Sequence, residues 1–133
     1  MPELRCIVVT PEATVLDEAA DFVALPLYDG EIGISPGHSP MLGRLGYGEM
    51  RIGRVPRAAS YYVDGGFVEV AGDVVSVLTG RAVPAAELSA DHAAEQLAAA
   101  FAETAHGEDQ LAVRDRRIAQ ARAQLHLARR ASV

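Results

Sequence analysis

Residues 63–79 read VDGGFVEVAGDVVSVLT. In Val68–Val70 and again in Val75–Val77, apolar and polar residues alternate with a period of two. This alternation is typical of a strand that turns one face toward a core and the other toward water. The stretch therefore predicts two half-buried strands, Gly66–Val70 and Val74–Thr79.

The same pattern extends toward the N-terminus. Between Leu4 and Gly80, short apolar runs are separated by turn-forming residues at intervals of roughly 8–12, the spacing of an antiparallel sandwich or barrel. The other predicted strands are Leu4–Thr10, Thr14–Leu16, Phe22–Leu27, Glu31–Ile34, Gly48–Arg54 and Ser60–Val63. The first part of the chain is therefore predicted to be all β.

The composition changes near Pro84. Eleven of the 12 glycines and all 7 prolines lie at or before Pro84, whereas 16 of the 24 alanines follow it. Glycine and proline punctuate strands and turns, and alanine favours helices. We therefore predict two domains, a β domain of residues 1–84 and a helical domain of residues 85–133.

The helical domain is predicted to be a hairpin. Ser89 suits the N-cap of a first helix, and His106-Gly107 suits its left-handed C-terminal end. In the second helix, Leu111, Ile118 and Leu125 recur every seven residues and indicate one apolar stripe. Because only one or two residues would connect the helices, they must run antiparallel.

The charged residues exclude several functions. The chain carries 12 basic residues, all of them arginine, against 18 acidic ones, for a net charge of -6. Without lysine there can be no GxxxxGK[ST] phosphate loop, Schiff base or Ser-Lys pair. The acidic balance argues against nucleic-acid binding.

Three other features are not predicted from the sequence. The single Cys6 cannot form an internal disulfide, and no His/Cys cluster has the spacing of a metal site. No apolar run is long enough to span a membrane.

Two motifs raise the possibility of catalysis. Gly33–Gly37 matches G-x-S-x-G around Ser35, with His38 three residues later. A nucleophile elbow needs a strand, a turn and then a helix, and the prolines and glycine after Ser35 oppose a helix there. Asp29 and Glu31 could be paired carboxylates, but neighbours on a hairpin tip are more often solvated or face a charged partner. We therefore predict turns at both places.

The C-terminal residues 110–133 hold one acid and six arginines, a charge of +5, whereas residues 85–109 carry -6. The six are Arg114, Arg116, Arg117, Arg122, Arg129 and Arg130. They could bind phosphate or RNA, but no aromatic residues are interleaved and an acidic helix lies beside them. Docking on an acidic protein surface is the stronger expectation.

Two stretches resemble a known family. Residues 30–42, GEIGISPGHSPML, followed by GEMRI at 48–52, closely resemble the first signature of the epsilon subunit of F-type ATP synthases. Residues 63–70, VDGGFVEV, followed by 74–78, resemble the second. The resemblance covers essentially the whole chain. It implies a mainly β plus α fold, a flattened ten-stranded β-sandwich followed by an antiparallel α-helical hairpin.

The resemblance also implies a function. Members of this family are noncatalytic rotor subunits of the central stalk, which couple the catalytic head to the membrane c-ring in ATP synthesis driven by a proton gradient. The implied partners are the gamma subunit, the c-ring, and the catalytic beta and alpha subunits through the hairpin, with no cofactor. The implied location is peripheral, on the cytoplasmic face of the bacterial inner (plasma) membrane.

Site residues follow by position in the matched motifs. The resemblance implies a c-ring contact at Asp29, Gly30 and Glu31, and a gamma contact at His38, Ser39 and Met41. It also implies that the hairpin can inhibit ATP hydrolysis by engaging an acidic segment of a catalytic subunit, for which the six arginines are the candidates.

One feature departs from the family. Some relatives bind ATP through [IL]-D-x-x-R-A at the start of the first helix, where this chain has Ser89 for Asp and His92 for Arg. A neutral imidazole is a poor substitute for a guanidinium facing phosphate, so ATP binding is not expected. The alternative reading of the whole chain is a stand-alone β-sandwich protein-binding module with a helical tail.

Overall fold

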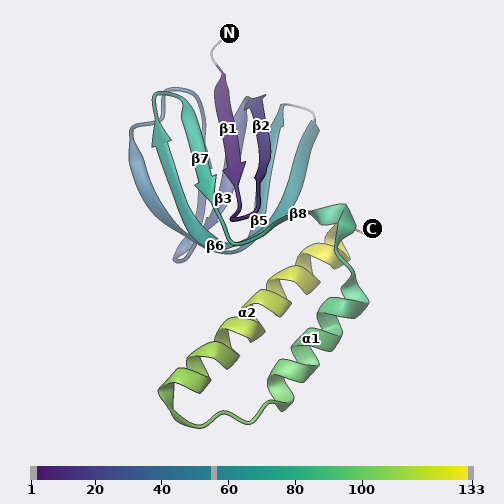
Figure 1. Ribbon diagram of the computed structural model, residues 1–133. Coiled ribbons are helices and arrows are strands. Elements are labelled where there is room, and N and C mark those ends of the chain that lie inside the picture. Colours follow the sequence, from purple (N-terminus) through teal and green to yellow (C-terminus); the bar gives the residue numbers. More distant parts are fainter. Residues whose placement is uncertain (1–2, 55–56, 132–133) are drawn as a thin grey trace. The chain divides into compact units, whose positions relative to one another are not determined.

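The computed structural model describes residues 3–54 and 57–131, and the chain divides into two compact units, residues 1–84 and 85–133. The first unit is built of strands and the second of helices (Figure 1). Each unit is described by itself below.

The first unit is one sheet that folds over on itself. Within the described residues it has eight strands: β1 (Leu4–Val9), β2 (Thr14–Ala20), β3 (Phe22–Leu27), β4 (Gly30–Ile34), β5 (Met41–Arg54), β6 (Arg57–Ala71), β7 (Val74–Leu78) and β8 (Ala82–Pro84). Their order is β2-β1-β7-β6-β5-β3-β4, and β8 pairs with β6. Neighbours are antiparallel except β1 and β7, which are parallel. A parallel pair needs a long connection, and the five strands between β1 and β7 supply it.

The long hairpin of β5 and β6 joins the two layers. Tyr61–Val63 of β6 pairs with β8, whereas the later segment Phe67–Ala71 pairs with β7. Between these segments, Gly65 and Gly66 have φ of +69° and +106°, which lets the strand bend without ending. The predicted β-sandwich is confirmed. Its ten strands appear as eight in the described residues, because β5 and β6 run as single strands of 14 and 15 residues.

The core lies between the layers and follows the predicted alternation. Val68 and Val70 of β6 and Val75 and Val77 of β7 are fully buried, whereas Glu69 is exposed. Buried partners come from the other strands: Leu4, Cys6, Val8, Val23, Leu25, Ile34, Leu45, Met50 and Ile52. The β6–β7 turn consists of Gly72 and Asp73, both with positive φ, as a type I′ turn requires.

The second unit contains a short 3-10 helix η1 (Ala85–Glu87) and two α-helices, α1 (Ala90–Ala102) and α2 (Gly107–Ala131). The helices lie side by side and antiparallel (Figure 1). Ser89 is the N-cap of α1, as predicted: its side chain accepts a 3.1 Å hydrogen bond from the backbone N–H of His92.

The end of α1 differs from the prediction. The helix stops at Ala102, because Glu103 leaves helical geometry with ψ of 129°, and residues 103–106 connect it to α2. Gly107 has the expected left-handed φ of +81°, but it begins α2 and does not end α1. The predicted connection of one or two residues was therefore too short.

Small residues dominate the seam between the helices. Ala93 and Ala100 of α1 are buried, as are Ile118, Ala121 and Leu125 of α2. Leu111, which was predicted on the apolar stripe of the second helix, is 44% exposed, and Phe101 of α1 is 47% exposed. Alanine on α1 permits close approach of Ile118 and Leu125, whereas Phe101 and Leu111 lie at the edge of the seam.

Candidate functional site

The β3–β4 hairpin presents Tyr28, Asp29, Gly30 and Glu31 to solvent. Leu27 pairs with Gly30 at its base, and the N–H of Tyr28 donates a 3.0 Å hydrogen bond to the carbonyl of Arg44. The Arg44 guanidinium lies 5.8 Å from the centre of the Tyr28 ring, within cation–π range. The tip is thus held by backbone pairing while its side chains stay accessible.

Glu31 forms an ion pair with a residue of another strand. Arg51 of β5 donates a 2.7 Å hydrogen bond from Nη2 to Glu31 Oε1. Strand β3 lies between β4 and β5, so the pair spans three strands. No pattern in the sequence predicts this partner, because only the sheet order brings Arg51 near Glu31. Asp29 makes no ion pair with the residues that the structure describes.

A second loop, residues 35–40, follows the other end of β4. The N–H of His38 donates to the carbonyl of Ser35 at 3.1 Å and closes a turn. Gly37 donates its N–H to Asp73 Oδ1 at 2.7 Å, which ties the loop to the β6–β7 turn. The His38 ring is half-buried, and its Nδ1 donates to the Ser39 carbonyl at 2.7 Å, since a carbonyl can only accept.

The predicted contact residues therefore form two groups at opposite ends of β4. Asp29, Gly30 and Glu31 lie at its start, and the loop with His38 and Ser39 lies beyond its end, with Met41 opening β5. Three strand residues, 32–34, at about 3.3 Å each, and the start of the following loop separate the two groups. The two groups therefore do not form one shared site.

Ser35 is exposed directly after β4, and the chain continues through a turn into strand β5. The strand–turn–helix geometry of a nucleophile elbow is therefore not formed at Ser35. Within the described part of the chain, no three His, Cys, Asp or Glu residues are grouped to hold a metal ion.

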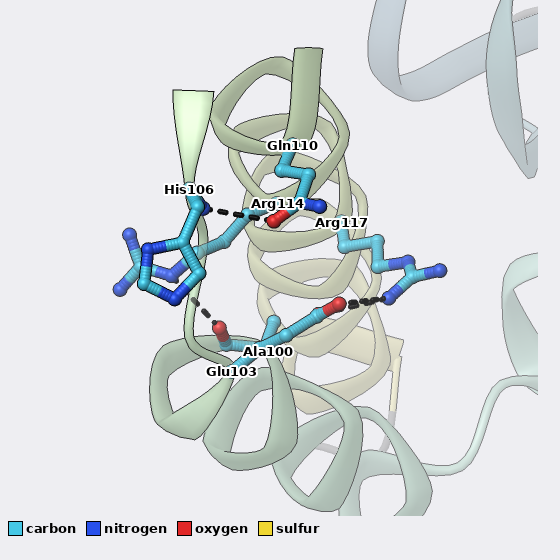
Figure 2. A network of polar contacts seen from close by, with 6 residues as sticks. All are labelled: Ala100, Glu103, His106, Gln110, Arg114 and Arg117. Carbon is cyan, nitrogen blue, oxygen red and sulfur yellow. Dashed lines mark hydrogen bonds and ion pairs between the residues drawn. The ribbon is translucent and has the colours of Figure 1, made fainter. Parts of the chain in front are cut away.

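Half of the six helical arginines face the neighbouring helix. Arg114 donates from Nε to the carbonyl of Ala100 at 3.1 Å (Figure 2). It also donates from Nη2 to the carbonyl of Phe101 at 3.3 Å. Arg117 binds both carboxylate oxygens of Glu103 at 2.8 Å. Arg122 lies 5.2 Å from the centre of the Phe101 ring.

The other three arginines, like Arg117 and Arg122, are exposed. Arg116 makes no hydrogen bond or ion pair with the described residues, while Arg129 and Arg130 occupy the last turn of α2. At the suggested nucleotide motif, the Ser89 hydroxyl is engaged as a helix cap and His92 is exposed. No helix in the described residues has the length and apolar character needed to cross a membrane.

Residues 3–85 match the model of the family described as ATP synthase, Delta/Epsilon chain, beta-sandwich domain. The chain belongs to this family. It is 49% identical over 126 residues to the ATP synthase epsilon chain of Rhodopirellula baltica, which covers 95% of this chain and 98% of that relative. It is 34% identical over 111 residues to the epsilon chain of Rubrobacter xylanophilus, covering 81% and 76% of the two chains. The family resemblance of the motifs is confirmed.

Solved structures show the same fold at low sequence identity. A chain of the Euglena gracilis mitochondrial ATP synthase OSCP/F1/c-ring structure matches with a TM-score of 0.83 at 20% identity, covering 92% of this chain and 79% of that one. A chain of the Tetrahymena thermophila mitochondrial ATP synthase central stalk/c-ring structure matches with a TM-score of 0.75 at 14% identity, covering 94% and 96%. Both matches extend beyond the sheet unit into the helices.

Proposed function

We propose that this chain is a noncatalytic subunit of the central stalk of an F-type ATP synthase. The observation that carries the proposal is the similarity to an ATP synthase epsilon chain over 98% of that relative's length. As part of the rotor, the chain would couple the catalytic head to the c-ring during ATP synthesis driven by a proton gradient. It would lie at the cytoplasmic face of the bacterial inner membrane without entering it.

The two units would have different roles in the complex. Residues 1–84 would form the fixed foot, with Asp29, Gly30 and Glu31 against the polar loops of the c-ring. The loop with His38 and Ser39, together with Met41, would meet the gamma subunit from the other end of β4. Charged groups at a solvated rim set register and association rate more than affinity, which suits a tip whose Glu31 remains 62% exposed beside Arg51.

The Glu31–Arg51 pair allows a sharp test of the c-ring contact. Glu31→Arg places two cations side by side and should reduce both the catalytic head retained on membranes and proton-driven ATP synthesis. Arg51→Gln is the matched control, because it breaks the same pair but leaves the acidic charge. An exposed pair contributes about 0–1 kcal/mol, so both variants should fold. Unchanged head retention and synthesis in Glu31→Arg would remove this assignment.

The helical unit would inhibit ATP hydrolysis, and this inhibition is called the brake below. Its six arginines carry the charge needed to engage an acidic segment of a catalytic beta or alpha subunit, and they include the proposed contacts. A chain ending at Pro84 should assemble into the complex but hydrolyse ATP faster than the full-length form. Equal hydrolysis rates with and without residues 85–133 would contradict the brake and leave the foot untouched.

A further inference from the structure

The carbonyl groups at the C-terminal end of α1 need hydrogen-bond donors from outside the helix. The last four carbonyls of an α-helix have no intrahelical donor, and a cation near them is stabilising because of the helix dipole. The last turn of α1 contains no basic residue. Its own chain supplies one N–H, from Glu103 to the Ala100 carbonyl at 3.3 Å. The remaining donors and the positive charge must come from elsewhere.

They come from α2. Arg114 reaches across and donates to two of the terminal carbonyls, that of Ala100 (Figure 2) and that of Phe101. Arg117 binds the Glu103 carboxylate at the residue where α1 ends. Arg122 lies over the ring of Phe101. Three guanidinium groups of one helix thus contact Ala100, Phe101 and Glu103 at the end of the other.

These contacts lie next to the connection between the helices. Residues 103–106 form that connection, and any opening of the hairpin must change their backbone. The connection is also held from its other side, where the His106 N–H donates to Gln110 Oε1 at 2.8 Å. The arginine contacts therefore act at the hinge, where they can set the angle between the helices.

We propose that Arg114, Arg117 and Arg122 form a hinge latch that couples closure of the hairpin to the integrity of the last turn of α1. Opening the hairpin removes the cap from α1, and fraying of α1 releases the arginines. While the hairpin is closed, an acidic partner segment must compete with the contacts that Arg114, Arg117 and Arg122 make inside the hairpin. That last consequence rests on the proposed brake function, whereas the latch itself does not.

The latch can be tested on the full-length chain. Spin labels at cysteines introduced by Asp91→Cys and His126→Cys, both exposed and far from the hinge, report the distance between the helices. Arg114→Gln, alone and with Arg117→Gln, should raise the ratio of open to closed hairpin by about 3- to 10-fold. Amide exchange in residues 100–103 should accelerate in the same variants.

Arg116→Gln is the matched control, since it removes the same charge two residues away from a side chain without a described partner. It should leave the spin-label distances and the exchange rates unchanged. Arg114→Lys should restore closure only in part, because an ammonium lacks the planar fork that reaches two carbonyls. Equal distance distributions in Arg114→Gln, Arg116→Gln and the parent chain would overturn the latch.

Hydrolysis by the reconstituted complex separates the latch from the brake. Arg116→Gln removes a docking charge and should relieve inhibition, whereas Arg114→Gln also favours the open hairpin and should relieve less or increase inhibition. If every variant hydrolyses ATP at the parent rate while the spin-label distances still shift, the latch stands and the brake is wrong. If the distances do not shift, the latch is wrong whatever the hydrolysis rates are.

Discussion

The backbone N–H of Gly37 donates a 2.7 Å hydrogen bond to Oδ1 of Asp73, 36 residues later in the chain. Asp73 has a φ of +62°, the only positive φ of a non-glycine residue in the described ranges. Its carbonyl accepts a 2.9 Å hydrogen bond from the N–H of Arg5. One turn residue thus holds strand β1, the β6–β7 turn and the proposed gamma-binding loop together.

Replacing Asp73 should loosen that loop. Asp73→Ala loses the acceptor for Gly37 and places an alanine at positive φ, so we expect it to lower the free energy of unfolding by about 1–3 kcal/mol. Asp73→Gly keeps the backbone geometry and loses only the acceptor, so it should cost less. All four tyrosines precede Pro84, so tyrosine fluorescence in urea reports the sheet unit. Unaltered amide protection of Gly37 in Asp73→Ala would contradict the role of this bond.

Gly66 should tolerate no side chain. A Cβ there would lie 1.9 Å from the carbonyl oxygen of Leu78, and its φ of +106° is strained for any L residue. We expect Gly66→Ala to cost more than about 4 kcal/mol or to prevent folding of the sheet unit. Gly72→Ala is the control, because its φ is +56° and a Cβ would meet nothing within 4 Å. It should cost only about 1–2 kcal/mol, and equal costs at the two positions would be the contrary result.

The stability of the sheet unit should depend on pH through the ion pair of Arg5 and Asp17. Arg5 donates from Nε and Nη2 to the two Asp17 oxygens at 2.9 and 2.8 Å, which lowers the pKa of that carboxyl below its ordinary value. A carboxyl with a lowered folded-state pKa stabilises the fold above its unfolded-state pKa, and the contribution is lost as the pH falls. An NMR titration of Arg5→Gln should show the pKa of Asp17 raised, while Arg44→Gln should leave it unchanged. An identical Asp17 pKa in Arg5→Gln would disprove the pairing in solution.

The single thiol should be inert in the folded protein. Burial, and next the negative charge of Glu18 and Asp17, raise the pKa of Cys6 to about 12. The thiolate is the reactive form, so the native chain should not react with a disulfide reagent at pH 8. One equivalent should react after denaturation in urea. Rapid labelling of the native chain would show that strands β1 and β2 separate readily.

Local patterns were enough to predict most elements. Period-two alternation marked β6 and β7, and Ser89 marked the start of α1, because each signal depends on neighbouring residues only. The end of α1 was missed, since it is completed by Arg114 and Arg117 from the next helix. Strand β6 was predicted as two short strands because its bend at Gly65 and Gly66 resembles a turn in the sequence.

For the candidate sites, the sequence by itself determined the family, the sandwich and hairpin, and the residues of the two loops, because these lie in contiguous motifs. The tertiary structure alone decided their partners. Arg51 meets Glu31 through the strand order, and Asp73 holds Gly37 through the sheet topology. Three of the six arginines contact the end of α1, and one of them, Arg114, caps its carbonyls. The sequence shows which segment carries the charges. Folding decides which of these side chains are engaged within the chain, because it brings distant groups within a few ångströms of them.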